Sequence, residues 1–402
     1  MEGGDLAAPR ERAERAGAAA FGRDWRPDRI ATAPGRIELL GNHIDYNGGP
    51  VLCAAIDRSV VVLADAAGDP IQIAAVAADA PELGVARVPA AAGDWRNAAP
   101  PPNSFDYVRG IAAAASRAGL PVRSGARLAF AGDVPIGFGL SSSAALCVGL
   151  GLASLERRPP FAELVLLAQA AEHRAGTPCG TMDQSASVAG GVIRYDGATL
   201  AIDRLDPDLG EFVFAVADSG VERALGASSY PVRVQESQAA LAFARRALNR
   251  HIDHLAALSD DDVQRLAAGP EPLPEPLLSR VRHVVAETGR VRDGEAALAV
   301  GDWPRFGRLM TASGHSSATL YAISHPRVEE LAAEALAVEG VLGARMMGGG
   351  EGGAALVLLP RARLKALAAA LRGGYYRQHD MAEQTGLIHP CRFAPGARVE
   401  KR

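Results

Sequence analysis

The sequence predicts an α+β protein built from two domains. Its 402 residues exceed what one hydrophobic core ordinarily organises, so two domains are the natural expectation. Strand-like and helix-like segments alternate in both halves of the chain, which favours two-layer α+β domains. Three glycine-rich stretches with charged or hydroxyl side chains lie between these segments. We expect an N-terminal extension over residues 1–24, a first domain over residues 25–205 and a second domain over residues 206–402.

Composition places the chain among soluble globular proteins. Apolar residues make up 48% of it and charged residues 22%, and the net charge of −4 gives no whole-chain attraction to nucleic acid or anionic membranes. No secretory signal and no run near the roughly 18 apolar residues of a membrane span occur. The four cysteines form no Cys-x-x-Cys pair, so we expect them to be reduced. These features predict a cytoplasmic protein with no nucleic-acid or membrane partner.

The first half of the chain is expected to alternate β-rich and helical segments. Residues 1–24 favour a frayed amphipathic helix, with ordered structure beginning near Arg29. Two β-rich runs, 30–40 and 51–63, flank a polar, glycine-containing connection. It carries too many polar side chains to be only a hairpin turn, so we expect it to have a functional role. Further strands are predicted at 71–75, 128–131 and 191–195, and helices at 105–117 and 161–174.

The second half is mainly helical. Its apolar spacing predicts helices over 235–254, 276–287 and 328–338. Strands are expected at 212–217, 354–359 and near 391–393, and no internal repeat is present.

Residues 133–149 form the stretch with the clearest chemical meaning. An apolar strand leads through Pro135, Gly137 and Gly139 into an alanine- and leucine-rich helix that begins with three serines. Glycines let backbone N–H groups converge, and the positive end of the helix dipole favours an anion, most often a phosphate. Taken alone, this stretch is also compatible with a capped helix after a tight turn, or with a dinucleotide-binding turn. The absence of Gly-x-x-x-x-Gly-Lys excludes a P-loop.

Two further stretches, 34–49 and 343–353, carry the remaining unusual residues. Together the three stretches fit phosphoryl transfer to a neutral hydroxyl. That reaction needs a nest for phosphates, oxygen ligands for a metal, a group beside the acceptor oxygen and charge to offset the transferred group. A hard cation such as Mg²⁺ would take oxygen ligands from a serine of the loop and from Glu172.

In their residues and in their order along the chain, these motifs resemble those of the galactokinase branch of the GHMP small-molecule kinases. The resemblance covers residues 29–397 and includes two connecting stretches, 171–184 and 228–233. Five ordered matches favour it over the dinucleotide interpretation, which explains only one of them. It implies an N-terminal ribosomal-protein-S5-like domain, a C-terminal ferredoxin-like α+β domain, and an active site in the cleft between them.

The resemblance also implies an ATP- and Mg²⁺-dependent kinase that phosphorylates the C1 hydroxyl of galactose. It identifies Arg36 and Asp183 as catalytic, with Asp183 either accepting the hydroxyl proton or only orienting the hydroxyl. A buried structural ion pair is the other interpretation of these two residues. The implied metal ligands are Glu172 and Ser143, with Ser142 as the alternative serine.

The remaining implied contacts fall into four groups. The ATP phosphate loop comprises Pro135, Gly137, Gly139, Leu140, Ser141, Ser142, Ser143 and Ala144. The sugar contacts are Asn42, His43, Asp45, Gly180 and Tyr230. The third glycine motif contains Gly348, Gly349, Gly350 and Gly352. The nucleoside is expected against residues 95–107.

Several positions depart from the family pattern. Asn42 stands where relatives usually carry a Glu that meets the sugar near C6, and a galacturonate kinase is therefore the leading alternative. Glu351 stands where relatives carry Phe. The spacing from Glu172 to Asp183 is one residue shorter than in relatives, and residues 316–321 lack their acidic character. A non-catalytic protein that senses sugar and ATP is a further alternative.

Overall fold

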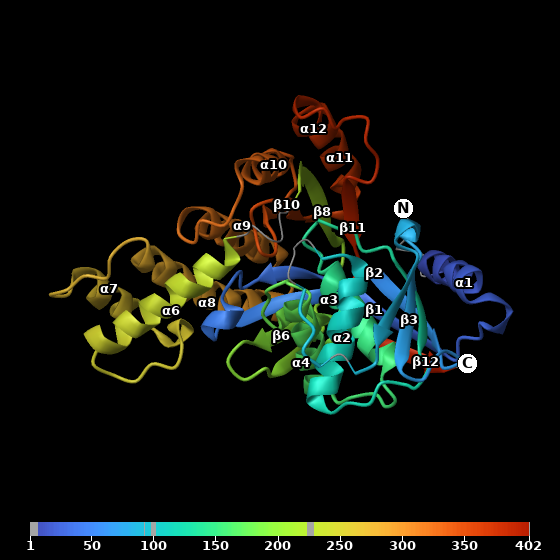
Figure 1. Ribbon diagram of the computed structural model, residues 1–402. Helices are drawn as coiled ribbons and strands as arrows, with labels where there is room; N and C mark the ends of the chain where they lie inside the picture. The colour runs from blue at the N-terminus through green and yellow to red at the C-terminus, as the bar shows by residue number, and fades with distance from the viewer. Residues whose placement is uncertain (1–6, 92, 98–101, 223–228, 402) are drawn as a thin grey trace.

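The computed structural model describes residues 7–91, 93–97, 102–222 and 229–401. Two β-sheets with helices around them form the molecule (Figure 1). The larger sheet has the strand order β12-β1-β2-β5-β3-β4, with β6 also pairing with β2, and β7 with β6. The smaller sheet has the order β11-β8-β10-β9. The chain therefore has the α+β class and the two-part architecture that the sequence predicts.

The larger sheet is built mostly from the first half of the chain. Its strands are β1 (Arg29–Leu40), β2 (Pro50–Asp65), β3 (Gln72–Ala77), β4 (Val85–Pro89), β5 (Arg127–Gly132), β6 (Val192–Asp196), β7 (Ile202–Leu205) and β12 (Arg398–Lys401). Only β3 and β5 pair in parallel, and the other pairs are antiparallel. This pattern does not suit the dinucleotide interpretation, because that turn belongs to a doubly wound parallel sheet.

Helices cover both faces of the larger sheet. On one face lies α1 (Ala7–Phe21), where Ala13 is fully buried with Trp25 and Ile30. On the other face lie α2 (Ser104–Ala118), α3 (Ser142–Ser154), α4 (Phe161–Arg174) and α5 (Met182–Ala189). Because both faces are covered, the long hairpin of β1 and β2 is almost entirely buried.

The smaller sheet belongs to the second half of the chain. Its strands are β8 (Phe212–Val221), β9 (Gly343–Met346), β10 (Gly353–Pro360) and β11 (Ile388–Cys391), all antiparallel. The helices of this half are α6 (Tyr230–Ala247), α7 (Asp260–Ala268), α8 (Leu277–Ala299), α9 (Trp303–Thr319), α10 (Pro326–Leu336), α11 (Leu364–Gly373) and α12 (Tyr375–Gln378). In Figure 1, α6, α7 and α8 form an extension on the side opposite α1.

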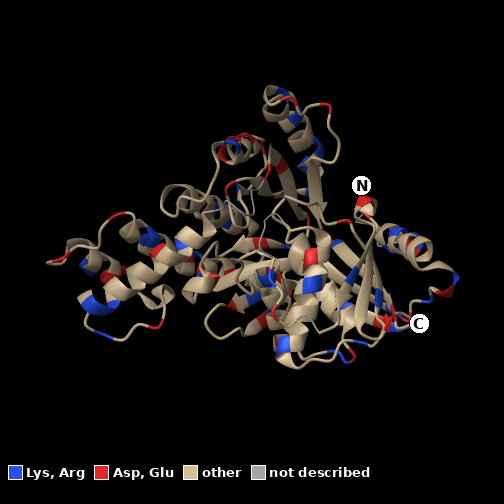
Figure 2. Cartoon of the chain, viewed as in Figure 1, with Lys and Arg blue, Asp and Glu red and all other residues tan. Residues whose placement is uncertain are grey.

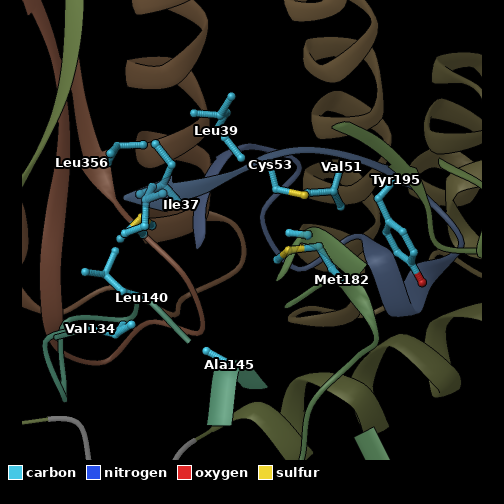
Figure 3. Packing of buried hydrophobic residues seen from close by; sticks show 14 of the residues in the cluster. Ile37, Leu39, Val51, Cys53, Val134, Leu140, Ala145, Met182, Tyr195 and Leu356 are labelled. Atoms are coloured by element: carbon cyan, nitrogen blue, oxygen red, sulfur yellow. The ribbon is translucent and has the colours of Figure 1, made fainter. Parts of the chain in front are cut away.

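One hydrophobic core joins the two sheets. The apolar side chains of Ile37 and Leu39 on β1 belong to the same buried cluster as Leu140 of the glycine loop and Leu356 of β10 (Figure 3). The glycine loop and β10 of the second half therefore pack against the same strand. This shared core places the loop at the junction of the two sheets.

Several elements differ from the sequence-based expectation. The N-terminal helix is not a frayed extension, because α1 packs on the sheet and Arg12 forms a 2.8 Å ion pair with Asp79. Residues after 181, expected as loop, form α5. The helix expected to reach residue 254 ends at Ala247, while α8 runs to Ala299, well past residue 287. The last strand, β12, pairs with β1 of the larger sheet, and the domain boundary near residue 205 stays a prediction.

In the described residues, no helix combines the length and the apolar character needed to cross a bilayer. Acidic and basic residues are interspersed along the described chain (Figure 2). All four cysteines are free, as expected, and three of them are buried.

Candidate active site

A cavity of about 420 Å³ lies where the two sheets meet. This volume is in the range of small-molecule sites. It brings together most of the residues singled out in the sequence: Arg36, His43, Asp45, Pro135, Gly137, Gly139, Leu140, Ser141, Ser142, Ser143, Glu172, Gly180, Asp183, Tyr230, Gly348 and Gly349 all line it. Four predicted residues do not line it: Asn42, Ala144, Gly350 and Gly352.

The glycine loop connects β5 to α3 and borders the cavity. Gly137 and Gly139 have φ angles of 87° and 73°, in the left-handed region that glycine adopts without a Cβ penalty. The loop is anchored to β1, because the backbone N–H of Arg36 donates to the Leu140 carbonyl at 3.1 Å. The start of α3 therefore faces the cavity with N–H groups that have no partner within the helix, which favours a bound phosphate.

Ser141 is the residue before α3, and it does not cap the helix with its side chain. It adopts a left-handed conformation with φ 58°, and its hydroxyl donates to Asp183 Oδ2 at 2.5 Å. The strained backbone thus directs the hydroxyl toward the carboxylate instead of the helix end. Ser141 is therefore not a simple helix cap, because its hydroxyl contacts Asp183 instead of the backbone of α3.

Asp183 lies in the first turn of α5 and is held from two sides. Arg36 Nε donates to Asp183 Oδ1 at 2.8 Å, and Arg36 Nη2 lies 2.7 Å from the same oxygen. Arg36 is almost fully buried, and its Nη1 donates to the Gly139 carbonyl at 2.5 Å. Although burial disfavours its charge, the carboxylates of Asp183 and Glu38 raise the pKa of Arg36, so the guanidinium stays charged. This pair lines the cavity, which a purely structural ion pair need not do.

Ser143 and Glu172 meet beside the phosphate loop. The Ser143 hydroxyl donates to Glu172 Oε1 at 2.8 Å, and the Gln184 amide donates to Glu172 Oε2. Burial, with a further contribution from the charge of Asp183, raises the pKa of Glu172 to about 7. Ser143, not Ser142, is therefore the serine that contacts this carboxylate, despite the shorter spacing between Glu172 and Asp183.

Aromatic and acidic groups from the sugar motif and the start of α6 also line the cavity. Tyr230, the first residue of α6, lies with its ring centroid 5.4 Å from that of His43 and 5.3 Å from that of Tyr46. The half-buried carboxyl of Asp45 lies against Gly180, where a Cβ would overlap with its Oδ2 atom. Burial raises the pKa of Asp45 to about 7, and the charges of Asp183 and Glu38 act in the same direction. Of the stretch 228–233, Ser228 lies outside the described residues.

Asn42 lies beneath the cavity and not in its wall. Its side chain is fully buried, donates to the Gly348 carbonyl at 2.8 Å and accepts from the Ser317 hydroxyl at 2.8 Å. It also donates to Glu38 Oε2 at 3.2 Å. The expectation that Asn42 removes negative charge from this end of the site is therefore not what the structure shows, because the carboxylate of Glu38 lines the cavity next to it.

Glu38 is the main site residue that the sequence analysis missed. It comes from β1, two residues after Arg36, and the other oxygen of its carboxylate pairs with Arg345 Nη2 of β9 at 2.7 Å. Side chains two apart on a strand share a face, so the period-two pattern from Arg36 was the available signal. Arg345 itself is buried and reaches Glu38 from the second half of the chain, which no sequence pattern announces.

The third glycine motif approaches the loop from the other sheet. Gly348 and Gly349 line the cavity, whereas Gly350 packs under the Ile323 carbonyl and Gly352 against the Val221 carbonyl. These two glycines serve close backbone packing and not contact with the cavity. Within the stretch 95–107, which is expected to contact the nucleoside, Pro102, Ser104 and Tyr107 line the cavity, whereas Trp95 and Phe105 do not. Residues 98–101 lie outside the described residues, and the nucleoside contact stays a prediction.

Known proteins share both the sequence and the fold of this chain. Three family models match it: the galactokinase galactose-binding signature over residues 18–66, the GHMP kinases N-terminal domain over 106–191 and the GHMP kinases C-terminal domain over 295–377. A galactokinase of Roseiflexus sp. (strain RS-1) is 38% identical over 383 residues, covering 92% of each chain. A galactokinase of Chloroflexus aurantiacus is 37% identical, covering 87% of this chain and 88% of that protein.

The fold comparison agrees with these matches. A crystal structure of Lactococcus lactis galactokinase complexed with galactose superposes with a TM-score of 0.85 at 28% identity, covering 96% of this chain and 98% of that one. The Methanococcus jannaschii mevalonate kinase shares the fold alone, with a TM-score of 0.62 at 17% identity. With the glycine loop, the Arg36–Asp183 pair and the sugar-motif strand converging on one cavity, the chain belongs to the galactokinases of the GHMP kinase superfamily.

Proposed function

We propose that this protein transfers the γ-phosphoryl group of ATP to the C1 hydroxyl of galactose. The observation that carries the proposal is the Asp183 carboxylate, held by Arg36 and Ser141 between the phosphate loop and the cavity end lined by His43 and Asp45. In the reaction, the C1 oxygen forms a bond to the γ-phosphorus as the bond from phosphorus to the bridging oxygen of ADP breaks. The hydroxyl proton leaves toward Asp183, whether this residue accepts it fully or only orients it.

The side chains around the transfer position have separate roles. Arg36 pairs with the Asp183 carboxylate and would place positive charge beside the phosphoryl group during its transfer. The α3 start and the loop N–H groups suit the phosphates of ATP. Asp45, with two acceptor oxygens, suits a pair of neighbouring hydroxyls on the sugar, and Gly180 allows it to approach closely.

The residues fit a bound magnesium ion. Ser143 and Glu172 offer a hydroxyl and a carboxylate oxygen side by side, which are the donors that a hard cation prefers. The described residues contain no group of three or more metal-binding side chains, so phosphate oxygens and water would complete the coordination. When bound, Mg²⁺ neutralises charge on the phosphates. The cytoplasmic location, and the absence of nucleic-acid partners, stay predictions from the sequence.

Glu38 favours galactose over galacturonate. Glu38 lines the cavity, and Asn42 and Arg345 each donate to one oxygen of its carboxylate. Each carboxylate oxygen has two acceptor sites, so the group can also accept from a sugar hydroxyl. A neutral sugar donates a hydroxyl proton there. A uronate would place a second carboxylate against the first with no proton to share, which costs binding energy.

A coupled ADP-release assay with galactose, galacturonate and glucose tests the proposal. Under Mg²⁺ and ATP we expect turnover of galactose, at least about 100-fold above galacturonate in kcat/KM. Asp183→Asn is the control, with kcat lower by about 100- to 10,000-fold and ATP binding retained. No ADP from any sugar indicates a non-catalytic sensor instead, and faster turnover of galacturonate reverses the assignment of Glu38.

A further inference from the structure

Glu351 departs from the family pattern, and its environment gives it a definite contact. It lies between Gly350 and Gly352 in the third glycine motif and has a left-handed φ of 60°. Its backbone N–H donates to the Ile323 carbonyl at 2.7 Å. A non-glycine residue held in this conformation is uncommon and needs surrounding contacts to maintain it. The backbone is thus fixed, and the side chain has a defined direction.

The carboxylate of Glu351 reaches the start of α6. The backbone N–H of Ser229, the residue immediately before this helix, donates to Glu351 Oε2 at 2.8 Å. No side chain caps the helix locally, and its first turn carries no acidic residue among the described residues. A carboxylate at a helix N-terminus satisfies a free donor and interacts favourably with the dipole. Glu351 therefore supplies, from 122 residues away, an anchor that no described residue next to the start of α6 provides with its side chain.

Anchoring α6 also places Tyr230. Tyr230 is the first residue of the helix, directly after Ser229, and it lines the cavity. Its ring packs on His43 and Tyr46, which come from the sugar motif of the first half of the chain. A small displacement of the helix start would move this ring relative to the sugar. Glu351 itself does not line the cavity.

We propose that Glu351 is a positioning residue for the sugar, acting through Ser229 and Tyr230. Its contact fastens the glycine motif of one segment to the helix that carries a sugar contact. This inference rests on the proposed galactose phosphorylation, but it concerns a residue outside the reaction itself. It predicts that Glu351 affects galactose affinity and leaves ATP affinity and the phosphoryl-transfer step unchanged.

Two substitutions distinguish the effect of the Glu351 carboxylate from the effect of the backbone conformation. Glu351→Gly removes the side chain while accepting the left-handed φ, so the backbone is not strained. Glu351→Gln keeps an oxygen that can accept from Ser229 and serves as the matched control. For Glu351→Gly we expect the KM for galactose to rise roughly tenfold, with kcat and the KM for ATP within about twofold of wild type. Glu351→Gln should stay within about threefold for galactose.

Two further measurements test the route through Tyr230. In a Tyr230→Ala background, adding Glu351→Gly should change the KM for galactose by less than about twofold, because the group being positioned is already gone. Amide hydrogen exchange at the start of α6 should be faster in Glu351→Gly than in wild type or Glu351→Gln. This second measurement needs no turnover, so it is independent of the proposed function.

The inference is overturned by any of three results. These are an unchanged galactose KM in Glu351→Gly, an equal rise in the KM for ATP, or unchanged exchange at the start of α6. Wild-type protein that releases no ADP with galactose contradicts the proposed function instead, and the exchange experiment then decides on Glu351 alone.

Discussion

Replacing Asp45 by Asn should make the empty protein more stable and abolish sugar binding. Asp45 lies half-buried in the cavity with its carboxyl against Gly180 and the sugar-motif backbone. Burial raises its pKa from 3.8 to about 7, and the nearby carboxylates of Asp183 and Glu38 add to the effect. At neutral pH and above, the folded protein therefore carries a charge that its surroundings disfavour. A sugar that donates hydroxyl protons to this carboxylate would relieve the cost.

The size of this cost follows from the two pKa values. A raised pKa means that the stabilising contribution is complete below pH 3.8 and is lost as the pH rises through about 7. With each tenfold change in proton affinity worth about 1.4 kcal/mol, the ionised side chain destabilises the empty protein by about 4 kcal/mol at pH 8. This is an upper limit, since solvent reaches part of Asp45 and screens its charge. Asp45→Asn should recover about half of it or more at pH 8 and nothing near pH 4.

Two assays check these values. Urea unfolding at pH 8 should give Asp45→Asn the larger free energy of unfolding, and the difference should vanish near pH 4. Calorimetric titration of galactose into wild type should show affinity falling about tenfold between pH 8 and pH 6, as the carboxylate becomes protonated. The pKa of Glu172 is also about 7, so its titration could produce a similar pH dependence. Glu172→Gln is the control, and galactose affinity in this variant should still fall between pH 8 and pH 6. Equal stability of both proteins at pH 8, or galactose affinity that does not change with pH, refutes this reasoning.

Three other substitutions have definite expected outcomes. Gly180→Ala should fold normally, because the φ of Gly180 is one that alanine adopts without strain. The added Cβ would displace the Asp45 carboxylate. The KM for galactose should therefore rise more than about tenfold, while the KM for ATP stays constant. Glu172→Gln should raise the Mg²⁺ concentration for half-maximal activity at least about tenfold, since Ser143 then faces a neutral amide; an unchanged requirement places the metal elsewhere. Glu287 lies fully buried on α8, with its Oε2 atom 2.6 Å from Arg290 Nε. Burial alone would raise its pKa, but the charges of Arg290 and His283 outweigh burial and lower the pKa of Glu287 from 4.5 to about 2. The stability that Glu287 contributes, about 3 kcal/mol, is therefore present above pH 4.5 and lost toward pH 2. Glu287→Gln should flatten the acid side of the urea-unfolding profile, and an unchanged acid slope speaks against this pKa.

The glycine loop and the Arg36–Asp183 pair could be predicted because both depend on short sequence motifs. Gly137 and Gly139 adopt the left-handed angles that only their residue type takes without penalty, and the helix after them begins where its serines predict. Arg36 and Asp183 meet as the family resemblance implies, although they are 147 residues apart. Neither residue by itself indicates the other, so this contact came from the resemblance and not from spacing.

The region around Asn42 and Glu38 shows where the sequence-based argument failed. Compared with the family pattern, Asn42 in place of Glu predicts that the site has lost a negative charge. In the folded protein Asn42 is buried outside the cavity lining, and that lining includes Glu38, which pairs with Arg345 from the other sheet. Which side chain lines the cavity depends on strand twist, on strand register and on the partner across the interface, and these are not local properties of the sequence.

By itself, the sequence determined the fold class, the family and the residue types that make phosphoryl transfer possible, since these depend on periodicity and on short motifs with fixed backbone requirements. Tertiary structure alone decided which of those residues share the cavity. It buried Asn42 outside the cavity lining, placed Glu38 in that lining, set Ser143 against Glu172, and anchored α6 to Glu351. The physical reason is that contacts between distant segments depend on how two sheets pack over a common core, and no segment carries that information alone.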